Sequence, residues 1–474
     1  YVQDQWKVLP GLTLSLGLRW DPSLLFTDAQ DRLSAYREGM QSRVYPTALP
    51  GMVFPGDPGI PSTIAGIESD LVAPRFGFAW SPSPSNRIAF RGGYGIYHDR
   101  LYSMTLNRFP LTQPFVLDVT VYDVDLLDPF RGKSPFPYAM PSTPEEASTL
   151  QFVRGIGFTS LSTDFTTPRT QQWNFNIQWE PATSYVITAA YVGSKTSHIF
   201  FSHNINPAIP NPTATVANTQ SRRPLADFGV LEEETTDGYS QYHSLQLMLN
   251  KRLTNSFTLL SSYTFSKNTG LTVAQAEGTQ GPRHPFNYSL DKGRLAYDVR
   301  HTWVSSGVWT LPPLKGSPGI LRWTLGGWEF NAIAALQSGS PFTVRSGVDN
   351  SLFGINGDTA DLVGNPLLDN GRPRAEQIAQ YFNTAAFKQN ARFTVGTAGI
   401  NILDGPGNIS TSLALNKNFP LRERASVQFR AEAFNATNRV NLGGPTASQN
   451  SPNFGRILGA GDPRVLQFAL KLKF

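Results

Sequence analysis

The segment Arg464-Val-Leu-Gln-Phe-Ala-Leu-Lys-Leu-Lys-Phe474 decides the fold, because it alternates apolar residues with polar or small ones up to its last aromatic residue. One face carries only apolar side chains, those of Leu466, Phe468, Leu470, Leu472 and Phe474. A tilted strand of about ten residues is long enough to cross a bilayer. The segment is therefore predicted to be a membrane-crossing β-strand of the kind that ends an outer-membrane β-barrel.

The composition of the chain favours β-structure. Charged residues make up only 16% and aromatic residues 12% of the 474 residues, and turn-forming Gly and Pro are frequent at 41 and 36. No run of about eighteen apolar residues exists, which excludes a transmembrane helix. The mean hydropathy of −0.24 is compatible with a barrel, because only every second residue of a barrel strand faces lipid.

The absence of cysteine and the modest charge exclude several classes of function. With 0 Cys, the chain has no disulfides, no thiol nucleophile and no Cys-ligated metal. The net charge of +5 is not accompanied by a dense Lys/Arg stripe, so no nucleic-acid partner is expected.

The unit of strand, tight turn, strand and long loop recurs along the chain, and it gives about thirteen strands. In Gln171–Glu180, for example, Trp173, Phe175, Ile177 and Trp179 alternate with amide side chains. The predicted strands are Tyr1–Leu9, Leu12–Trp20, Arg75–Ser81, Arg87–Tyr97, Gln171–Glu180, Tyr185–Gly193, Tyr242–Arg252, Ser256–Lys267, His301–Leu311, Gly326–Gln337, Ile409–Phe419, Arg424–Asn435 and Arg464–Phe474.

The connections between these strands alternate strictly between short and long, as they do in outer-membrane barrels with short periplasmic turns and long extracellular loops. The predicted short turns are Pro10-Gly11, Pro82–Asn86, Pro181–Ser184, Leu253–Asn255, Leu311–Leu321 and Pro420–Glu423. The predicted long loops are Asp21–Pro74, His98–Thr170, Ser194–Gln241, Asn268–Arg300, Ser338–Gly407 and Ala436–Pro463. The fold class is thus all-β, a transmembrane antiparallel β-barrel.

The direction of the strands predicts that the barrel is larger than this chain. If the last strand ends in the periplasm, Tyr1–Leu9 also descends, whereas a barrel entered from the periplasm begins with an ascending strand. The odd count of about thirteen agrees, since bacterial single-chain barrels have even counts. Residues 1–474 are therefore expected to be the C-terminal portion of a barrel whose first strands precede Tyr1.

The two faces of the strands differ in chemistry. Aromatic residues on the outward face are expected to form two interfacial girdles: Trp6, Trp20, Trp80, Trp173, Trp179, Tyr185, Tyr191, Tyr263, Phe265, Trp328, Phe419 and Phe474. A β-sandwich core, the alternative, would leave the amides of the other face unsatisfied. The candidate solute contacts on that lumenal face are Arg19, Gln172, Asn174, Asn176, Gln178, Gln246, Gln428, Arg430 and Glu432.

Catalytic signatures are absent from the sequence, and no catalytic, cofactor or metal site is predicted. Gly193-Ser-Lys-Thr196 resembles the end of a phosphate loop but lacks the upstream Gly, so it is interpreted as a polar loop start. Glu232-Glu-Glu234 with Asp237 could coordinate Ca²⁺, but is interpreted as a solvated acidic loop. The six scattered His are interpreted as solvated loop residues.

The chain resembles the barrel of TonB-dependent outer-membrane receptors, in particular the Oar-like group with carboxypeptidase-regulatory-like N-terminal domains. The resemblance rests on several segments and on their order along the chain: Tyr1–Lys7, Leu14–Asp21, Pro74–Trp80, Arg91–Tyr97, Asp298–Pro312 and Phe429–Asn438, with the terminal Phe474. It implies a barrel of about twenty-two strands with a plugged lumen, and it implies that the plug, the energy-coupling box and the signal peptide lie outside this chain. The family has no catalytic residues to carry over.

The leading functional hypothesis is active import of a scarce solute, such as an oligosaccharide, a peptide or a metal chelate, captured by long loops and passed along the lumen. The expected partners are outer-membrane lipid, the TonB energy-coupling complex, the barrel assembly machinery acting on the strand that ends at Phe474, and the solute. A structural or adhesive surface protein is the alternative. A passive pore ranks lower, and an outer-membrane enzyme ranks last.

Overall fold

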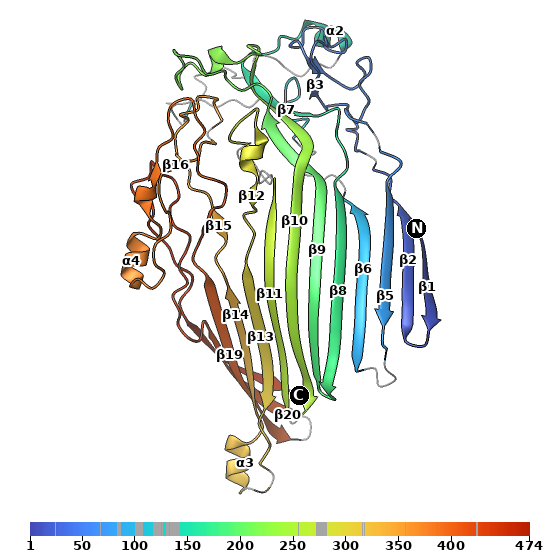
Figure 1. Ribbon diagram of the computed structural model, residues 1–474, viewed down its shortest axis with the longest axis vertical. Helices are drawn as coiled ribbons and strands as arrows, with labels where there is room; N and C mark the ends of the chain where they lie inside the picture. Colours follow the sequence, from blue (N-terminus) through green and yellow to red (C-terminus); the bar gives the residue numbers. More distant parts are fainter. Residues whose placement is uncertain are drawn as a thin grey trace.

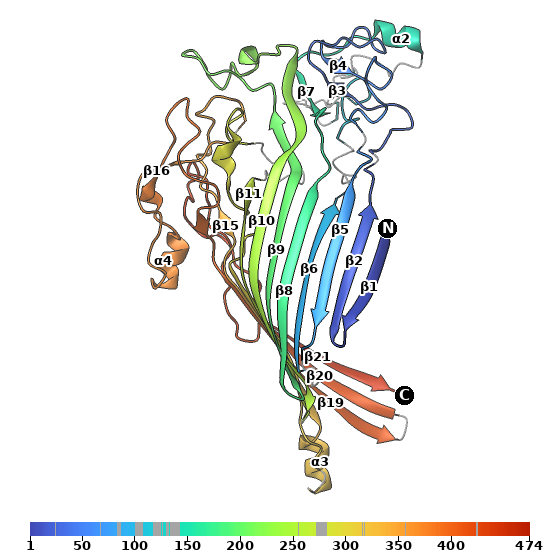
Figure 2. The ribbon, with the colours of Figure 1, turned by 45° about the vertical axis from the view of Figure 1, so that its right-hand side comes forward.

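The computed structural model describes the chain except for residues 24, 67, 83–86, 100–107, 117–124, 126, 129–131, 133–142, 255, 272–281, 315, 317, 356 and 423–424. One long antiparallel sheet runs through the molecule, and it curves so that its last strands turn away from the plane of the central ones (Figures 1 and 2). Within the described residues, no helix is long and apolar enough to cross a membrane.

The sheet confirms the thirteen predicted strands, and they pair strictly in chain order. Their bounds are β1 (Val2–Leu9), β2 (Leu12–Trp20), β5 (Val72–Trp80), β6 (Ile88–His98), β8 (Arg169–Ala182), β9 (Tyr185–Asn204), β10 (Phe228–Thr254), β11 (Phe257–Leu271), β13 (His301–Thr310), β14 (Trp328–Gln337), β19 (Asn408–Arg422), β20 (Ala425–Phe434) and β21 (Val465–Lys473). β1 and β21 form the two edges of the sheet.

The register keeps the apolar residues of all these strands on one face. Phe175 pairs with Tyr191, Tyr191 with Leu245, and Leu245 with Phe265. We call this the aromatic face, because the predicted girdle residues that lie in paired strands are all on it. Its side chains are exposed, with 43% of Phe175 and 75% of Leu470 accessible. Apolar exposure on this scale indicates a surface that is covered by lipid.

Gly193 shows why this face needs a glycine. It lies opposite Trp173, and a Cβ at this position would come within 2.5 Å of the indole ring. The missing side chain therefore lets the ring lie across β9. The Gly193-Ser-Lys-Thr196 segment is part of strand β9, so it does not form a phosphate loop. The prediction that a polar loop begins at this segment is also wrong.

The short turns lie at one end of the sheet and the long connections at the other (Figure 1). Gly11 closes the β1–β2 turn with a φ of +88°, a conformation that glycine adopts without strain. The turn predicted at Pro82–Asn86 falls largely on residues 83–86, which lie outside the described part. The β13–β14 connection is longer than predicted because it contains a helix, α3 (Gly319–Leu325), and β14 begins at Trp328 rather than Gly326.

The loop predicted at Ser194–Gln241 is the main error in the strand assignment. β9 and β10 are 20 and 27 residues long, and they continue as a paired ribbon far beyond the aromatic face. β7 (Ile156–Leu161) adds to this ribbon in parallel with β10. The alternation of the sequence breaks where the register shifts between Thr235 and Gly238, so the extension has no continuous period of two.

The long connections, together with the β9–β10 ribbon, fold into a layer that we call the cap. Short elements occur in it: β3 (Ala35–Tyr36), β4 (Met52–Val53), α2 (Pro144–Thr149), η1 (Gln220–Arg222), η2 (Tyr288–Asp291), β12 (Gly293–Arg294), β15 (Pro341–Phe342), β16 (Asp361–Leu362), α4 (Arg374–Ala379), η3 (Thr384–Ala386), β17 (Phe387–Lys388) and β18 (Leu403–Asp404). The buried apolar clusters lie here, around Leu33, Phe54 and Phe382. Among the described residues, the hydrophobic core therefore lies in the cap.

Candidate functional site

The side chains selected from the sequence all lie on the face opposite the aromatic face, as predicted. Their pairing partners place them there: Asn176 pairs with Ala190, and Ala190 with Gln246, whereas their chain neighbours belong to the aromatic face. The same register holds for Arg19, Gln172, Asn174, Gln178, Gln428, Arg430 and Glu432. We call this the lumenal face. A role of these residues in binding a solute stays a prediction.

Five of the nine residues lie on β8 and β10, on the same lumenal side of the sheet. Gln172, Asn174, Asn176 and Gln178 line β8, and Gln246 lies two strands away on β10. Arg91 of β6 pairs with Asn176, and its guanidinium donates a hydrogen bond to Oε1 of Gln178. With Arg91 these residues make up what we call the lumenal wall. It offers amide donors and acceptors beside one fixed cation, which suits a polar solute.

Three more residues form a second group on β20, and the structure does not bring it into the lumenal wall. The Arg430 guanidinium is ion-paired with Glu432, and Gln428 precedes them on the same face. Glu329 accepts hydrogen bonds from Asn331 at 3.0 Å and from Asn416 at 3.2 Å beside this group. Arg19 is separate from both groups, at the upper end of β2, where it pairs with Asp21 at 2.9 Å.

The acidic cluster of Glu232, Glu233 and Glu234 is not a solvated loop, which corrects the sequence interpretation. It lies on β10 within the cap, where Arg108 is ion-paired with both Glu232 and Glu234. Glu234 is only 1% exposed, and its burial raises the pKa of its carboxyl despite the guanidinium. Among the described residues, no group of three or more His, Asp or Glu could hold a metal ion.

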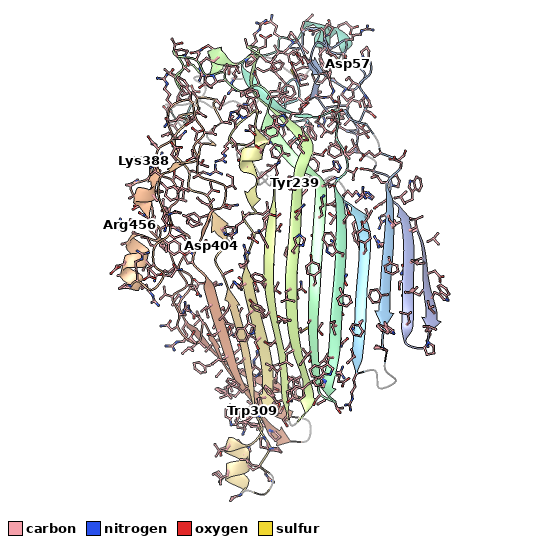
Figure 3. All side chains as sticks on the ribbon, in the orientation of Figure 1. Asp57, Tyr239, Trp309, Lys388, Asp404 and Arg456 are labelled. Atoms are coloured by element: carbon pink, nitrogen blue, oxygen red, sulfur yellow. The ribbon has the colours of Figure 1, made fainter. Side chains whose placement is uncertain are left out.

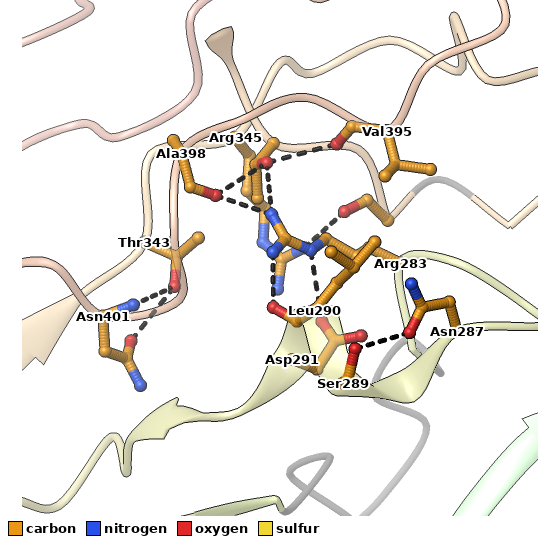
Figure 4. A network of polar contacts seen from close by, with 12 residues as sticks. Arg283, Asn287, Ser289, Leu290, Asp291, Thr343, Arg345, Val395, Ala398 and Asn401 are labelled. Carbon is orange, nitrogen blue, oxygen red and sulfur yellow. Dashed lines mark hydrogen bonds and ion pairs between the residues drawn. The ribbon is translucent and has the colours of Figure 1, made fainter. Parts of the chain in front are cut away.

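A second charged centre joins two connections of the cap (Figure 4). Arg283, from the β11–β13 connection, donates hydrogen bonds to Thr359 Oγ1 at 2.8 Å and to the Ala398 carbonyl at 2.6 Å, both in the β14–β19 connection. Its Nε lies 3.7 Å from Oδ1 of Asp291. Burial raises the pKa of Asp291 to about 6. These contacts tie two long connections together through buried charges.

A cavity of about 610 Å³ opens in the cap beside the upper ends of β19 and β20. Its polar lining includes Asn370, Arg374, Gln377, Tyr381, Asp404 and Arg439. Burial, together with the charge of Asp404, raises the pKa of Tyr381 to about 12. The volume falls in the range of small-molecule sites.

Sequence reasoning missed this cavity and the buried charges of the cap. The lining comes from three stretches, residues 366–382, 402–407 and 439–442, that have no common pattern. Arg108 and Glu234 are likewise 126 positions apart.

Comparisons with known proteins agree with this architecture. The sequence model of the family described as "Outer membrane beta barrel domain" matches residues 1–467. A search of curated proteins gives no match. Several solved structures are similar to this chain at low sequence identity. The outer membrane transporter YddB of Escherichia coli is 10% identical with a TM-score of 0.47, and the alignment covers 86% of this chain and 41% of that one.

Two other solved structures match the chain with comparable identity, TM-score and coverage. The FrpB iron transporter of Neisseria meningitidis is 11% identical with a TM-score of 0.44, over 98% of this chain and 44% of that one. The ferripyoverdine receptor of Pseudomonas aeruginosa is 10% identical with a TM-score of 0.42, over 100% of this chain and 38% of that one. The chain spans less than half the length of each of these proteins. It belongs to the outer membrane beta barrel domain family and is an integral outer-membrane β-barrel protein.

Proposed function

We propose that this chain forms the C-terminal part of the barrel of a TonB-dependent receptor that imports a scarce polar solute. The proposal rests on the lumenal wall, where Asn174, Asn176, Gln178 and Arg91 lie on adjacent strands, on the face of the sheet opposite the aromatic face. A row of amides and a cation facing away from lipid can exchange hydrogen bonds with a passing solute, and in a lipid-exposed position the same groups would be costly.

The distribution of charge on the lumenal face favours a neutral or anionic solute. Lys7, Arg75, Arg91, Lys471 and Lys473 all lie on this face by register. The acidic residues Glu329 and Glu432 of the same face already accept hydrogen bonds from Asn331 and Arg430. Oligosaccharides, carboxylate-bearing peptides and anionic metal chelates are therefore the classes to test first.

Energy coupling, a barrel of about twenty-two strands and the Oar-like subtype are parts of the same proposal, and they rest on the resemblance of the sequence segments. A plug and an energy-coupling box encoded upstream of Tyr1 would complete the transporter. The strand ending at Phe474 is proposed to be the element on which the barrel assembly machinery acts.

The test is energised uptake in cells that produce the full protein. Radiolabelled solutes of the three classes are supplied at low concentration, with and without a protonophore. We expect uptake of one class to depend on the protein and to stop when the protonophore is added. Uptake that persists after the proton gradient is dissipated would contradict energy coupling and favour a passive pore.

A matched pair of variants separates the lumenal wall from the barrel as a whole. Replacing Asn174, Asn176 and Gln178 by Leu removes the amides, and we expect uptake to fall by roughly tenfold or more, because each lost charge-neutral hydrogen bond is worth about 1 kcal/mol. The control replaces Phe175 and Ile177 of the same strand by Leu, which keeps the lipid-facing surface apolar. Equal uptake in both variants would argue against the lumenal wall.

The second candidate, an adhesive or structural surface protein, is favoured by the β9–β10 ribbon. At about 3.3 Å per residue, the 27 residues of β10 extend far beyond a hydrocarbon core of about 30 Å. A rigid projection of this length presents the cap away from the membrane. Loss of cell-surface attachment without loss of uptake, after deletion of the ribbon, would favour this second function.

A further inference from the structure

The helix α3, at the short-turn end of the molecule, exposes apolar side chains instead of burying them. Of its residues, Ile320 is 74%, Trp323 54% and Leu325 57% exposed. If only water surrounded this helix, much of its apolar surface would stay exposed to water, which is unfavourable. Figures 1 and 2 show α3 extending beyond the lower ends of β13 and β14.

The contacts of α3 attach it to the aromatic face and not to the lumen. The indole Nε1 of Trp328 donates a hydrogen bond to the Thr324 carbonyl at 2.9 Å. The rings of Trp323 and Phe419 lie 4.9 Å apart. Trp328 and Phe419 both belong to the aromatic face by register, and Trp309 of the same face lies directly above α3 (Figure 3).

Lys417 reinforces this attachment in an uncommon way. It lies on the aromatic face of β19, pairs with Trp328 and is only 3% exposed. Its Nζ donates hydrogen bonds to the carbonyls of Thr324 at 3.0 Å and Gly326 at 2.6 Å, at the C-terminal end of α3. This end of a helix carries a partial negative charge. The helix end therefore satisfies a cation that would otherwise meet lipid.

We propose that α3 is an interfacial helix, and that phospholipids of the periplasmic leaflet cover Ile320, Trp323 and Leu325. The exposed surface of α3 continues the lipid-covered aromatic face past the ends of the strands, through Trp328, Phe419 and Lys417. A Trp beside exposed aliphatic residues and an Arg, here Arg322, is the composition of segments that lie in the headgroup region. The inference does not depend on what the barrel transports.

The absence of cysteine allows a direct test. Ile320→Cys is introduced into the full protein, in which any cysteine outside these 474 residues is replaced by serine. The protein is labelled with an environment-sensitive fluorophore and reconstituted in vesicles of phosphatidylethanolamine and phosphatidylglycerol. Thr183→Cys, an exposed position in the β8–β9 turn at the same end of the barrel, is the matched control. We expect lipids with a nitroxide near the headgroup to quench the Ile320 label, and aqueous iodide to quench it roughly fivefold less than the Thr183 label.

Two outcomes would overturn the proposal. Strong iodide quenching at Ile320 would place α3 in water, and shielding from both iodide and lipid quenchers would mean that protein covers the helix. A third variant, Lys417→Gln, tests the attachment itself. The folding control is that the Ile320→Cys/Lys417→Gln barrel still resists heat denaturation in detergent. In this folded variant, lipid quenchers are expected to quench the label at position 320 less. Unchanged quenching would refute the role of Lys417.

Discussion

The sheet and the cap use the same kinds of residue in opposite ways. In the sheet, Leu470 and Phe468 are 75% and 69% exposed, and in the cap Phe54 and Leu231 are 1% and 0% exposed. Both arrangements follow from the surroundings, because apolar surface is stable in lipid or inside protein but not in water. In the part of the chain that the structure describes, the buried apolar clusters all lie in the cap, and the side chains are crowded at its upper end (Figure 3).

The comparison implies that the two parts fail differently when an aromatic residue is lost. Phe54→Ala in the cap is expected to cost about 3–5 kcal/mol, because a fully buried Phe leaves a cavity. Hydrogen exchange of the amides around Met52 and Phe158, which belong to the same cluster, measures the loss. Phe468→Ala in β21 is the control and is expected to change stability less, since lipid fills the space. A similar loss of stability for Phe54→Ala and Phe468→Ala would contradict the difference between the packed cap and the lipid-covered sheet.

A charge placed on the aromatic face is expected to destabilise the inserted barrel, whereas a charge on the lumenal face is not. Ile177→Arg is expected to destabilise the inserted barrel by about 2–4 kcal/mol, because Ile177 lies on the lipid-facing side of β8. Phe429→Arg is a second site of the same kind. Unfolding by urea in lipid vesicles measures the cost. The control Gln246→Arg lies on the lumenal face of β10 and should change stability by no more than about 0.5 kcal/mol. Tolerance of charge at Ile177 would refute the lipid face.

The cap is expected to respond to pH, through the buried Asp291. Folding raises the pKa of this carboxyl from 3.8 to about 6, so the folded state binds the proton more tightly. The stability of the contact between the β11–β13 and β14–β19 connections is therefore greatest at low pH, and it falls as pH rises from about 4 to about 6. The change is at most about 3 kcal/mol, since one pKa unit corresponds to about 1.4 kcal/mol.

The measurement is amide hydrogen exchange in the two connections as a function of pH. Each measured rate is divided by the intrinsic exchange rate at the same pH. Asp291→Asn keeps the size of the side chain and removes its titration, so its profile should be flat over the same interval. A wild-type cap that becomes more protected as the pH rises would contradict the assigned sign.

The smallest effect is expected in the lumenal wall. Asn174→Ala should change the stability of the barrel by no more than about 0.5 kcal/mol, because the side chain faces the lumen and not a packed core. Denaturation in detergent measures it, with Phe175→Ala on the other face for comparison. A loss of several kcal/mol at Asn174 would mean that the lumenal wall is structural.

The sheet could be predicted from the sequence because its pattern is local. A strand between lipid and a wet lumen must alternate at every second residue, so Trp173–Trp179 and Leu466–Leu472 can be recognised without knowing their neighbours. The β9–β10 ribbon was not predicted from the sequence, because both of its faces contact protein or water and neither faces lipid. A register shift near Thr235 also interrupts the alternation of its residues. The helix α3 escaped because seven residues contain too little pattern.

The candidate site could be predicted only in part. Register placed the amides of β8 correctly on the lumenal face, because facing is also a local property. The grouping of those amides with Arg91, the pairing of Arg108 with Glu234, and the cavity lined by Arg374 and Arg439 depend on segments far apart in the sequence. No local pattern encodes such contacts, so the sequence could indicate charged and polar loops but not which residues meet.

The most direct test of the account is the facing of side chains along β8. Single cysteines at positions 173–178 of the cysteine-free chain carry a nitroxide spin label in lipid vesicles. Collision with oxygen, which concentrates in lipid, is expected to peak at Trp173, Phe175 and Ile177. Collision with a water-soluble nickel complex should peak at Asn174, Asn176 and Gln178. Equal accessibility at all six positions, or the inverse alternation, would contradict a barrel wall between lipid and lumen.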